Sequence, residues 1–417
     1  MGIITGITQA WLTRSFKGFE FESKYFDYLD YSNSKNVGLY IHIPFCKKIC
    51  EFCPYCKYIF DEVKMNLYID MLLKEIDLAC KGHDKQEVTS LYFGGGSPAL
   101  SIKRLPDILS KINKHFIITE GIGIELHPSD VDVENLNILK SLGFTKISIG
   151  IQSFQDKFLA ILGRKNNDFD EMFKVLKSFE FETVAMDFIF ALPFQEFSDI
   201  KKDIEIAFSN GANYIAIYPF IDFGFLNGNI HALSKKEKRT FLKDITDYCC
   251  SKGYVRDSIW TFSRNGKSEY SSMTRENYLG FGCSATTVLD RIFKINTFDM
   301  NSYISRLENN HLPTSLICNF TLRQRMIYYL FWVMYGMELD TKDFYDFFGV
   351  ELKNYYGIEF LIARLFGFVS YKNGKYRLTE KGAFYYHHYE KYYTYNYINH
   401  MWGKMSKEAF PKGLNIK

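Results

Sequence analysis

Between about residue 37 and residue 220, short β-branched runs alternate with amphipathic stretches of helical length, and this alternation limits the possible folds more than any other feature. The strand-like runs are Gly38–Ile43, Val88–Phe93, Ile122–Leu126, Lys146–Ile151, Val184–Ile189 and Tyr214–Tyr218. The helical stretches between them are Lys64–Cys80, Ile102–Lys114, Val133–Leu142, Asp168–Phe179 and Asp199–Asn210. Six consecutive β/α units predict an α/β protein with a parallel sheet, either doubly wound or curved into a partial barrel. In both architectures ligands bind beyond the carboxyl ends of the strands.

The β/α alternation fades after about residue 225, and the remaining chain is rich in helical patterns. The helical pattern Leu352–Phe366 precedes FVSYKNGKYRLTEKG, in which Asn373–Gly374 is a strong hairpin signal. Helix followed by hairpin is typical of a winged-helix-like element, for which packing over a neighbouring domain is favoured over DNA binding. We expect an N-terminal extension (1–36), a core domain (37–290) and a helix-rich C-terminal domain (291–417).

Charge and hydropathy exclude several classes of partner. Lys and Arg total 51 against 48 Asp and Glu, so a net charge of +3 predicts no nucleic-acid partner. The first residues lack the unbroken apolar stretch of a secretory signal, which favours a cytoplasmic protein. The apolar run Met326–Met337 is about half of the roughly 20 residues needed to cross a bilayer, so it predicts a buried helix and no membrane span.

Four of the nine cysteines fall between positions 46 and 56, in the segment GLYIHIPFCKKICEFCPYC. A strand there runs into a loop that begins at Pro44, and the spacing of Cys46, Cys50 and Cys53 lets one loop place three thiolates round a small iron–sulfur cluster. Three protein ligands leave one iron open to a substrate. Zinc is the alternative, because Cys50-x2-Cys53 or Cys53-x2-Cys56 suits it, but no second ligand pair follows at a typical spacing.

The segment HIPFCKKICEFC resembles the CxxxCxxC signature of radical S-adenosylmethionine (SAM) enzymes, in particular the oxygen-independent coproporphyrinogen III oxidase-like family. SLYFGGGSPALS, IELHPSDV, ISIGIQSFQDKFLAILGR and MDFIFALPFQ resemble further segments of that family, in the same order. The resemblance covers roughly residues 37–290 and implies a partial (β/α)6 TIM-type barrel with a [4Fe–4S] cluster on Cys46, Cys50 and Cys53. It also implies that SAM binds the fourth iron and is cleaved reductively to a 5′-deoxyadenosyl radical. One or two SAM molecules and a low-potential electron donor of the flavodoxin or ferredoxin class are then expected.

Several residues outside the cysteine loop are candidates for SAM contacts. Gly94, Gly95 and Gly96 follow a strand and let the backbone approach a ligand closely, where a tight turn is the alternative. Glu125 and Asp187 lie in otherwise apolar strands, so each carboxylate needs a partner, either SAM or a structural contact.

The resemblance adds three further SAM contacts and one secondary candidate. Tyr40 lies on the strand before the cysteines, while Gln152 and Arg164 reach the same strand-end mouth. Cys283 lies in a Gly-rich loop, Gly280–Ser284, near the expected opening, and is either catalytic or a small buried residue.

The cysteine segment departs from the family at one position. Coproporphyrinogen oxidases usually have CxC after the third ligand, whereas this chain has Cys53-Pro-Tyr-Cys56, which puts porphyrinogen decarboxylation in doubt. His42, at the family's HIPFC position, is expected to orient the loop.

Three reactions fit the resemblance. The first is methyl or methylene transfer to a conjugated or tetrapyrrole-like substrate, favoured by the CPYC variant and the aromatic C-terminal segment. The second is anaerobic coproporphyrinogen III oxidation, and the third is haem binding by a non-enzymatic chaperone. His387, His388 and His400 are candidates to meet haem iron, although exposed or packing roles are favoured.

Overall fold

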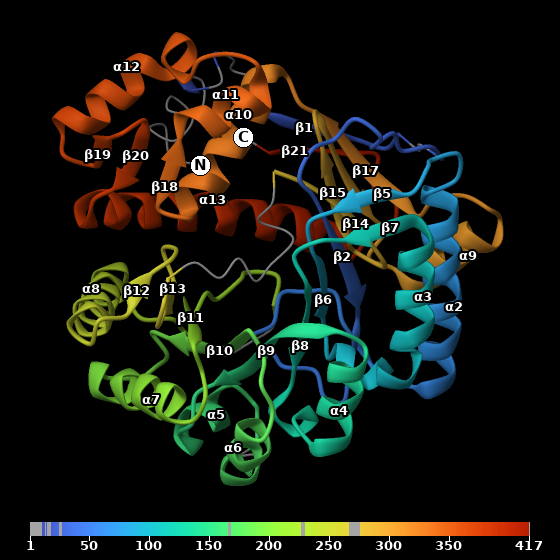
Figure 1. Ribbon diagram of the computed structural model, residues 1–417, viewed down its shortest axis with the longest axis horizontal. Coiled ribbons are helices and arrows are strands. Elements are labelled where there is room, and N and C mark those ends of the chain that lie inside the picture. Colours follow the sequence, from blue (N-terminus) through green and yellow to red (C-terminus); the bar gives the residue numbers. More distant parts are fainter. Residues whose placement is uncertain are drawn as a thin grey trace.

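The protein is described by a computed structural model over residues 11–12, 14, 18–24, 27–165, 168–226, 230–266 and 276–416. Its main element is a mixed 14-stranded sheet with helices packed along its outside (Figure 1). Its centre is a block of seven parallel strands, of which six follow one another in chain order: β2 (Val37–Ile43), β6 (Leu91–Gly95), β8 (Ile122–Leu126), β9 (Phe144–Gln152), β10 (Thr183–Phe190) and β11 (Tyr214–Pro219). The seventh, β14 (Asn277–Phe281), lies parallel to β2 on its other side. The predicted α/β core with six parallel strands is therefore confirmed.

One predicted strand is divided in the structure. The run expected at Val88–Phe93 forms β5 (Gln86–Val88), which pairs with β7 (Phe116–Ile118), and then β6 in the main sheet. The break occurs because the Thr89 N–H donates to Val37 O and the Leu39 N–H donates to Ser90 O, which moves the chain from one pairing to the other.

The five predicted helices of the β/α units are present, with shorter helices between them. They are α2 (Glu62–Ala79), α3 (Leu105–His115), α4 (Val133–Ser141), α6 (Phe169–Lys177) and α7 (Phe197–Ser209), and the shorter ones are η1 (Pro98–Arg104), η2 (Pro128–Asp130) and α5 (Asp156–Ile161). Asp61, Asp132 and Asp168 begin α2, α4 and α6, because each side chain accepts a hydrogen bond from an N–H of the first turn.

The sheet continues on both sides of these six strands. Beyond β11 lie β13 (Thr261–Ser263) and β12 (Val255–Arg256), preceded by α8 (Lys235–Ser251). Beyond β2 follow β14 (Asn277–Phe281), β15 (Thr286–Leu289), β16 (Ile292–Asn296), β17 (Thr314–Asn319), β1 (Phe19–Glu22) and β21 (Gly413–Ile416). The sheet therefore extends across the expected domain limit at residue 290 and includes strands near both termini. The expected domain limits stay a prediction.

The C-terminal part is helical, as predicted. It consists of α9 (Met300–Glu308), α10 (Leu322–Tyr335), α11 (Thr341–Phe348), α12 (Leu352–Leu365) and α13 (Glu380–Met405), with a small sheet of β18 (Glu338–Asp340), β19 (Val369–Lys372) and β20 (Lys375–Leu378). The predicted hairpin turn is present, with positive φ at Asn373 and Gly374. The run Met326–Met337 falls mainly in α10, and no helix among the described residues is long and apolar enough to cross a membrane.

Left-handed backbone conformations gather at the carboxyl ends of the parallel strands. Positive φ occurs at Gly95 in β6, at Gln152 in β9, at Ala191 after β10 and at Gly282 after β14. Gln152 and Ala191 are not glycines, so each costs of the order of 1 kcal/mol or more that the surrounding contacts must offset. Such strain is typical of functional sites, and here it lies at the carboxyl ends of the parallel strands.

Candidate functional site

The cysteine loop leaves the carboxyl end of β2 and is closed by two short strands, β3 (Phe45–Cys46) and β4 (Tyr58–Ile59). The Tyr58 N–H donates to Pro44 O at 2.6 Å and the Phe60 N–H donates to Cys46 O at 2.9 Å, so both ends of the loop are fixed. Between them Cys50 and Cys53 sit in a turn in which the Cys53 N–H donates to Cys50 O at 3.3 Å.

The three predicted ligand cysteines are free, partly buried thiols that lie close enough to affect one another. Burial raises the pKa of Cys46 to about 12, and the neighbouring Cys53 and Cys50 add to the shift. Burial also raises the pKa of Cys53. A cationic centre among these thiols would reverse such shifts, because metal-bound cysteine is deprotonated.

The glycine segment packs between this loop and Glu125, which explains why no Cβ is tolerated there. A Cβ on Gly96 would lie 2.4 Å from Phe45 O and 2.9 Å from Cys46 Sγ. A Cβ on Gly94 would lie 2.9 Å from Glu125 Oε1. Gly95 has φ +121° and donates its N–H to Glu125 Oε2 at 3.1 Å.

Glu125 and Asp187, from β8 and β10, are a pair of neighbouring carboxyls at the site. Burial raises the pKa of Glu125 to about 8, and the nearby Asp187 adds to this shift. Burial also raises the pKa of Asp187 to about 7, against the opposing effects of a Ser148 hydrogen bond and of Arg164. Ser148 Oγ donates to Asp187 Oδ2 at 2.9 Å, while Asp187 Oδ1 is buried without a partner among the described residues. One oxygen of the pair, Asp187 Oδ1, therefore still lacks a donor.

Gln152 and Arg164 approach the same region from β9 and the turn after α5. Arg164 Nη1 donates to Gly150 O at 2.5 Å, and its guanidinium lies 5.8 Å from the centre of the Phe52 ring in the cysteine loop. The Arg164 Nε atom is buried with no partner in the described part of the chain. Arg164 thus links the cysteine loop to the end of β9, and its Nε–H can still donate to a ligand.

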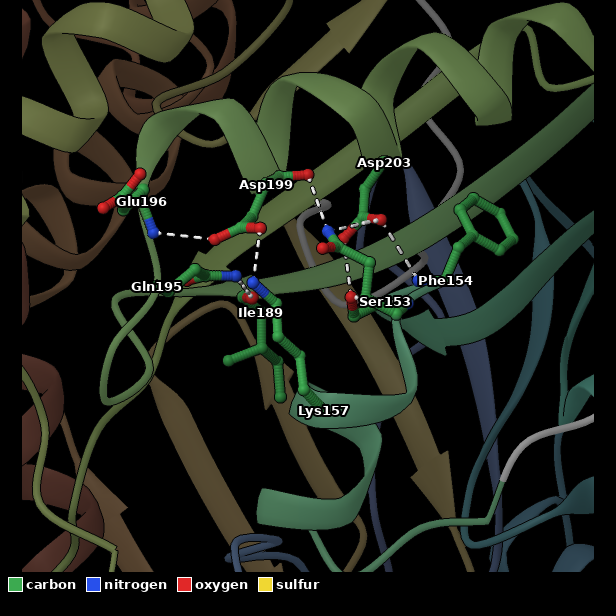
Figure 2. Close-up of polar contacts among 9 residues, drawn as sticks. Ser153, Phe154, Lys157, Ile189, Gln195, Glu196, Asp199 and Asp203 are labelled. Atoms are coloured by element: carbon green, nitrogen blue, oxygen red, sulfur yellow. Dashed lines mark hydrogen bonds and ion pairs between the residues drawn. The ribbon is translucent and has the colours of Figure 1, made fainter.

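The segment after Gln152 is held in place by Asp203 on α7 (Figure 2). Asp203 Oδ2 accepts from Ser153 Oγ at 2.7 Å, and Oδ1 accepts from the Phe154 N–H at 3.2 Å and from Gln155 Nε2 at 3.3 Å. This network fixes the backbone directly beyond the strained Gln152.

Tyr40 and His42 connect β2 to the end of the cysteine loop. His42 Nε2 lies 3.2 Å from Cys56 O, and His42 Nδ1 lies 3.0 Å from the Tyr40 hydroxyl. Burial lowers the pKa of His42 to about 4, so the ring is neutral, donates from Nε2 to the carbonyl and accepts the Tyr40 proton at Nδ1. His42 has the geometry expected of a residue that orients the loop.

The predicted site residues separate into two groups. Tyr40, Glu125, Gln152, Arg164 and Asp187 come together with the glycines and the three cysteines at one edge of the sheet. The Cys283 side chain instead packs with Cys56 in the main core, and His400 is exposed. The side chains of His387 and His388 lie outside the described residues.

Sequence reasoning missed three neighbours of the carboxyl pair. Ser148 bonds Asp187, while Tyr55 and Tyr92 are close enough to be affected by both carboxyls. Ser148 could have been found from the sequence, because it is a polar residue, two positions after Lys146, in a strand that ends in the site. A separate cavity of about 370 Å³ borders Ile122 and Gly143, at the amino ends of β8 and β9, far from this chemistry.

Residues 40–207 match the family model described as the Radical SAM superfamily. Curated relatives include the heme chaperone HemW of Bacillus subtilis, 27% identical over 66% of this chain and 76% of the relative. They also include the oxygen-independent coproporphyrinogen III oxidase of Pseudomonas aeruginosa, 24% identical over 77% of this chain and 76% of the relative. The solved coproporphyrinogen III oxidase (HemN) of Escherichia coli matches with a TM-score of 0.74 at 18% identity, covering 91% of this chain and 96% of that one. The chain therefore carries a radical SAM domain, and its homologues are HemW and oxygen-independent coproporphyrinogen III oxidase.

Radical SAM proteins imply a [4Fe–4S] cluster and SAM, and the residues present fit both groups. Cysteine thiolates are the ligands that hold [4Fe–4S] clusters, and Cys46, Cys50 and Cys53 are three free thiols of one loop that lie close enough to affect one another. The buried carboxyl pair and the unpaired Asp187 Oδ1 suit the ammonium, sulfonium or ribose hydroxyls of SAM.

Proposed function

We propose that this protein is a radical SAM enzyme that acts on a conjugated, tetrapyrrole-like small molecule. Bound to Cys46, Cys50 and Cys53, a [4Fe–4S] cluster would supply one electron to SAM and so generate a 5′-deoxyadenosyl radical that abstracts hydrogen from the substrate. The observation that carries the proposal is the meeting of three thiols, a glycine segment and two unbalanced carboxyls at one sheet edge.

The chain's own residues bind and orient in this proposal. The glycine segment Gly94–Gly96 lets the backbone reach the cofactor, and Glu125 and Asp187 accept its positive and hydroxyl groups. Arg164 and Gln152 border the same space, and the loop end is held by His42. An external low-potential donor of the flavodoxin or ferredoxin class would deliver the electron.

Three outcomes at the substrate remain distinct. Methyl or methylene transfer is our sequence-based hypothesis and has no counterpart in the names of the relatives given above. Coproporphyrinogen III oxidation is favoured by the relatives of that name and by the match over nearly the whole HemN chain. Haem binding without turnover is favoured by the HemW relatives.

One experiment separates these outcomes. The protein is reconstituted with iron and sulfide without oxygen, reduced with dithionite and given SAM, with and without coproporphyrinogen III or haem. Deoxyadenosine together with S-adenosylhomocysteine would support methyl transfer, and deoxyadenosine with decarboxylated porphyrinogen would support the oxidase. Neither product from a fully loaded cluster would refute the enzymatic proposal. Cys46→Ala is the control, since loss of a ligand should abolish SAM cleavage.

A further inference from the structure

Two cysteines outside the cluster ligands lie side by side although 227 positions separate them in the chain. Cys56 Sγ and Cys283 Sγ are 3.9 Å apart, and both side chains are buried, at 9% and 0% exposure. Cys56 Sγ donates to Phe298 O at 3.3 Å and Cys283 Sγ donates to the same carbonyl at 3.1 Å. Phe298 O is thus a shared acceptor that keeps the two thiols next to each other.

The pair joins the cysteine loop to a distant part of the sheet. Cys56 lies two residues before Tyr58, whose hydroxyl also donates to Phe298 O, at 2.8 Å. Cys283 lies in the turn between β14 and β15, where its N–H donates to the Tyr68 hydroxyl on α2 at 3.0 Å. The Tyr68 hydroxyl in turn donates to His42 O at 2.6 Å, so α2 positions both cysteines.

The thiols of the pair are not among the proposed SAM contacts, although His42 connects the Cys56 carbonyl to the Tyr40 hydroxyl. Cys56, Cys283 and Tyr68 belong to the main core, whereas Tyr40 packs with Tyr92 and Ala285 in a cluster of its own. The three ligand positions are already filled by Cys46, Cys50 and Cys53, and neither Cys56 nor Cys283 has a part in the proposed SAM chemistry.

Burial decides which oxidant reaches these thiols. Cys283 has no exposed surface and Cys56 keeps only 9%, so a bulky disulfide such as oxidised glutathione has no access to the pair. Hydrogen peroxide is small enough to react at the exposed part of Cys56. The two sulfurs are in van der Waals contact at 3.9 Å, and they must approach by about 1.9 Å to reach the roughly 2.05 Å of a disulfide bond.

We propose that Cys56 and Cys283 are a redox-active dithiol that hydrogen peroxide converts to a disulfide. Two S–H bonds break and one S–S bond forms, while the two electrons and two protons reduce the peroxide to two waters. A small dithiol reductant reverses the step. The bond ties the end of the cluster loop to the β14–β15 turn and constrains the unfolded chain across a long loop, which stabilises the protein when the cluster is absent.

The test uses the full cluster-free chain, treated with a small excess of hydrogen peroxide and then with an alkylating reagent. Peptide mapping by mass spectrometry should find a Cys56–Cys283 cross-link that dithiothreitol removes. The melting temperature should rise by several degrees on oxidation. Cys283→Ser should lose both effects, and Cys56→Ser is the second variant, because its hydroxyl can keep the bond to Phe298 O.

Cys80→Ser is the matched control, since Cys80 is buried away from this pair and its loss should leave both effects intact. Cross-links only among Cys46, Cys50 and Cys53, or an equal melting shift in Cys283→Ser, would overturn the proposal. The inference holds for any substrate of the enzyme, so its failure would leave the proposed function untouched.

Discussion

Glu125 and Asp187 take up protons at far higher pH than ordinary carboxyls, because burial raises their pKa values to about 8 and about 7. In the unfolded chain both groups titrate near pH 4. The folded state therefore binds more protons between these limits, and stability falls as pH rises through the window. A ligand that carries positive charge would relieve this penalty.

This linkage predicts a pH-dependent difference between the wild type and the double variant Glu125→Gln, Asp187→Asn. The stability contribution of the pair is fully present below about pH 4 and is lost as the pH rises through about 7 to 8. The melting temperature of the wild type should therefore fall by several degrees relative to the variant between about pH 6 and about pH 9. Glu134→Gln, on the exposed face of α4, is the control and should run parallel to the wild type. Parallel curves for the double variant would contradict the burial argument.

Asp187 carries a second prediction, on ligand affinity. Its Oδ1 atom is free for a ligand group, so Asp187→Asn should weaken SAM binding to the reconstituted protein at least about tenfold, or about 1.4 kcal/mol. The iron content should stay unchanged, because Asp187 is no cluster ligand. Ser148→Ala, which removes the hydrogen bond to Oδ2, should give a smaller loss. Equal SAM affinity in Asp187→Asn would remove this residue from the cofactor site.

At the scale of elements, the exposed face of the cysteine loop carries two lysines and one glutamate, Glu51. Lys47 and Lys48 lie between the proposed ligands Cys46 and Cys50, and the Lys47 side chain, 3.5 Å from Asp130 Oδ1, is 62% exposed. Electron donors of the flavodoxin class are acidic, and charge complementarity mainly raises the rate of association. The loop is therefore the surface on which we expect such a donor to dock.

The charge-reversal variant Lys47→Glu, Lys48→Glu tests this expectation. Donor-driven SAM cleavage at low salt should fall at least about tenfold, and the defect should shrink as salt is added. Cleavage driven by dithionite should be unchanged, which controls for damage to the cluster. Lys174→Glu on α6 is the matched surface control. A loss with both reductants would show that the lysines hold the loop itself.

The network of Figure 2 gives the second prediction at this scale. Asp203→Ala leaves Ser153, the Phe154 N–H and Gln155 without their shared acceptor, so it should destabilise the protein by about 2–3 kcal/mol in denaturant unfolding. Lys157→Ala removes an ion pair with Asp199 and a contact with the Phe158 ring, both made by an exposed side chain, and should cost about 0–1 kcal/mol. Similar losses in the two variants would show that Asp203 is not the residue that fixes this turn.

At the scale of the molecule, the sequence predicted the features that depend on local residue patterns. The six parallel strands and five helices were evident from periodicity, and the Asn373–Gly374 hairpin was evident from turn chemistry. Pairings between distant segments were not evident, because short strands such as β1 and β21 carry no signal of their partners. The contact between Cys56 and Cys283 was hidden for the same reason, since it depends on how α2 and β14 pack.

The strands β1 and β21 are the last two of the sheet, beyond β17, and they come from opposite ends of the described chain. Gly18, just before β1, packs so tightly that a Cβ would lie 2.4 Å from Ile416 O, a backbone atom that cannot rotate away. Gly18→Ala should therefore push the two strands apart and cost about 1–3 kcal/mol in denaturant unfolding. Gly357→Ala on α12 is the matched control, because its Cβ would meet only Lys353 Cβ, at 3.7 Å, and alanine favours the helix. If Gly18→Ala matched the wild type in stability and in cluster loading, the edge strands would contribute little, and the parallel strands with their helices would account for the stability of the whole molecule.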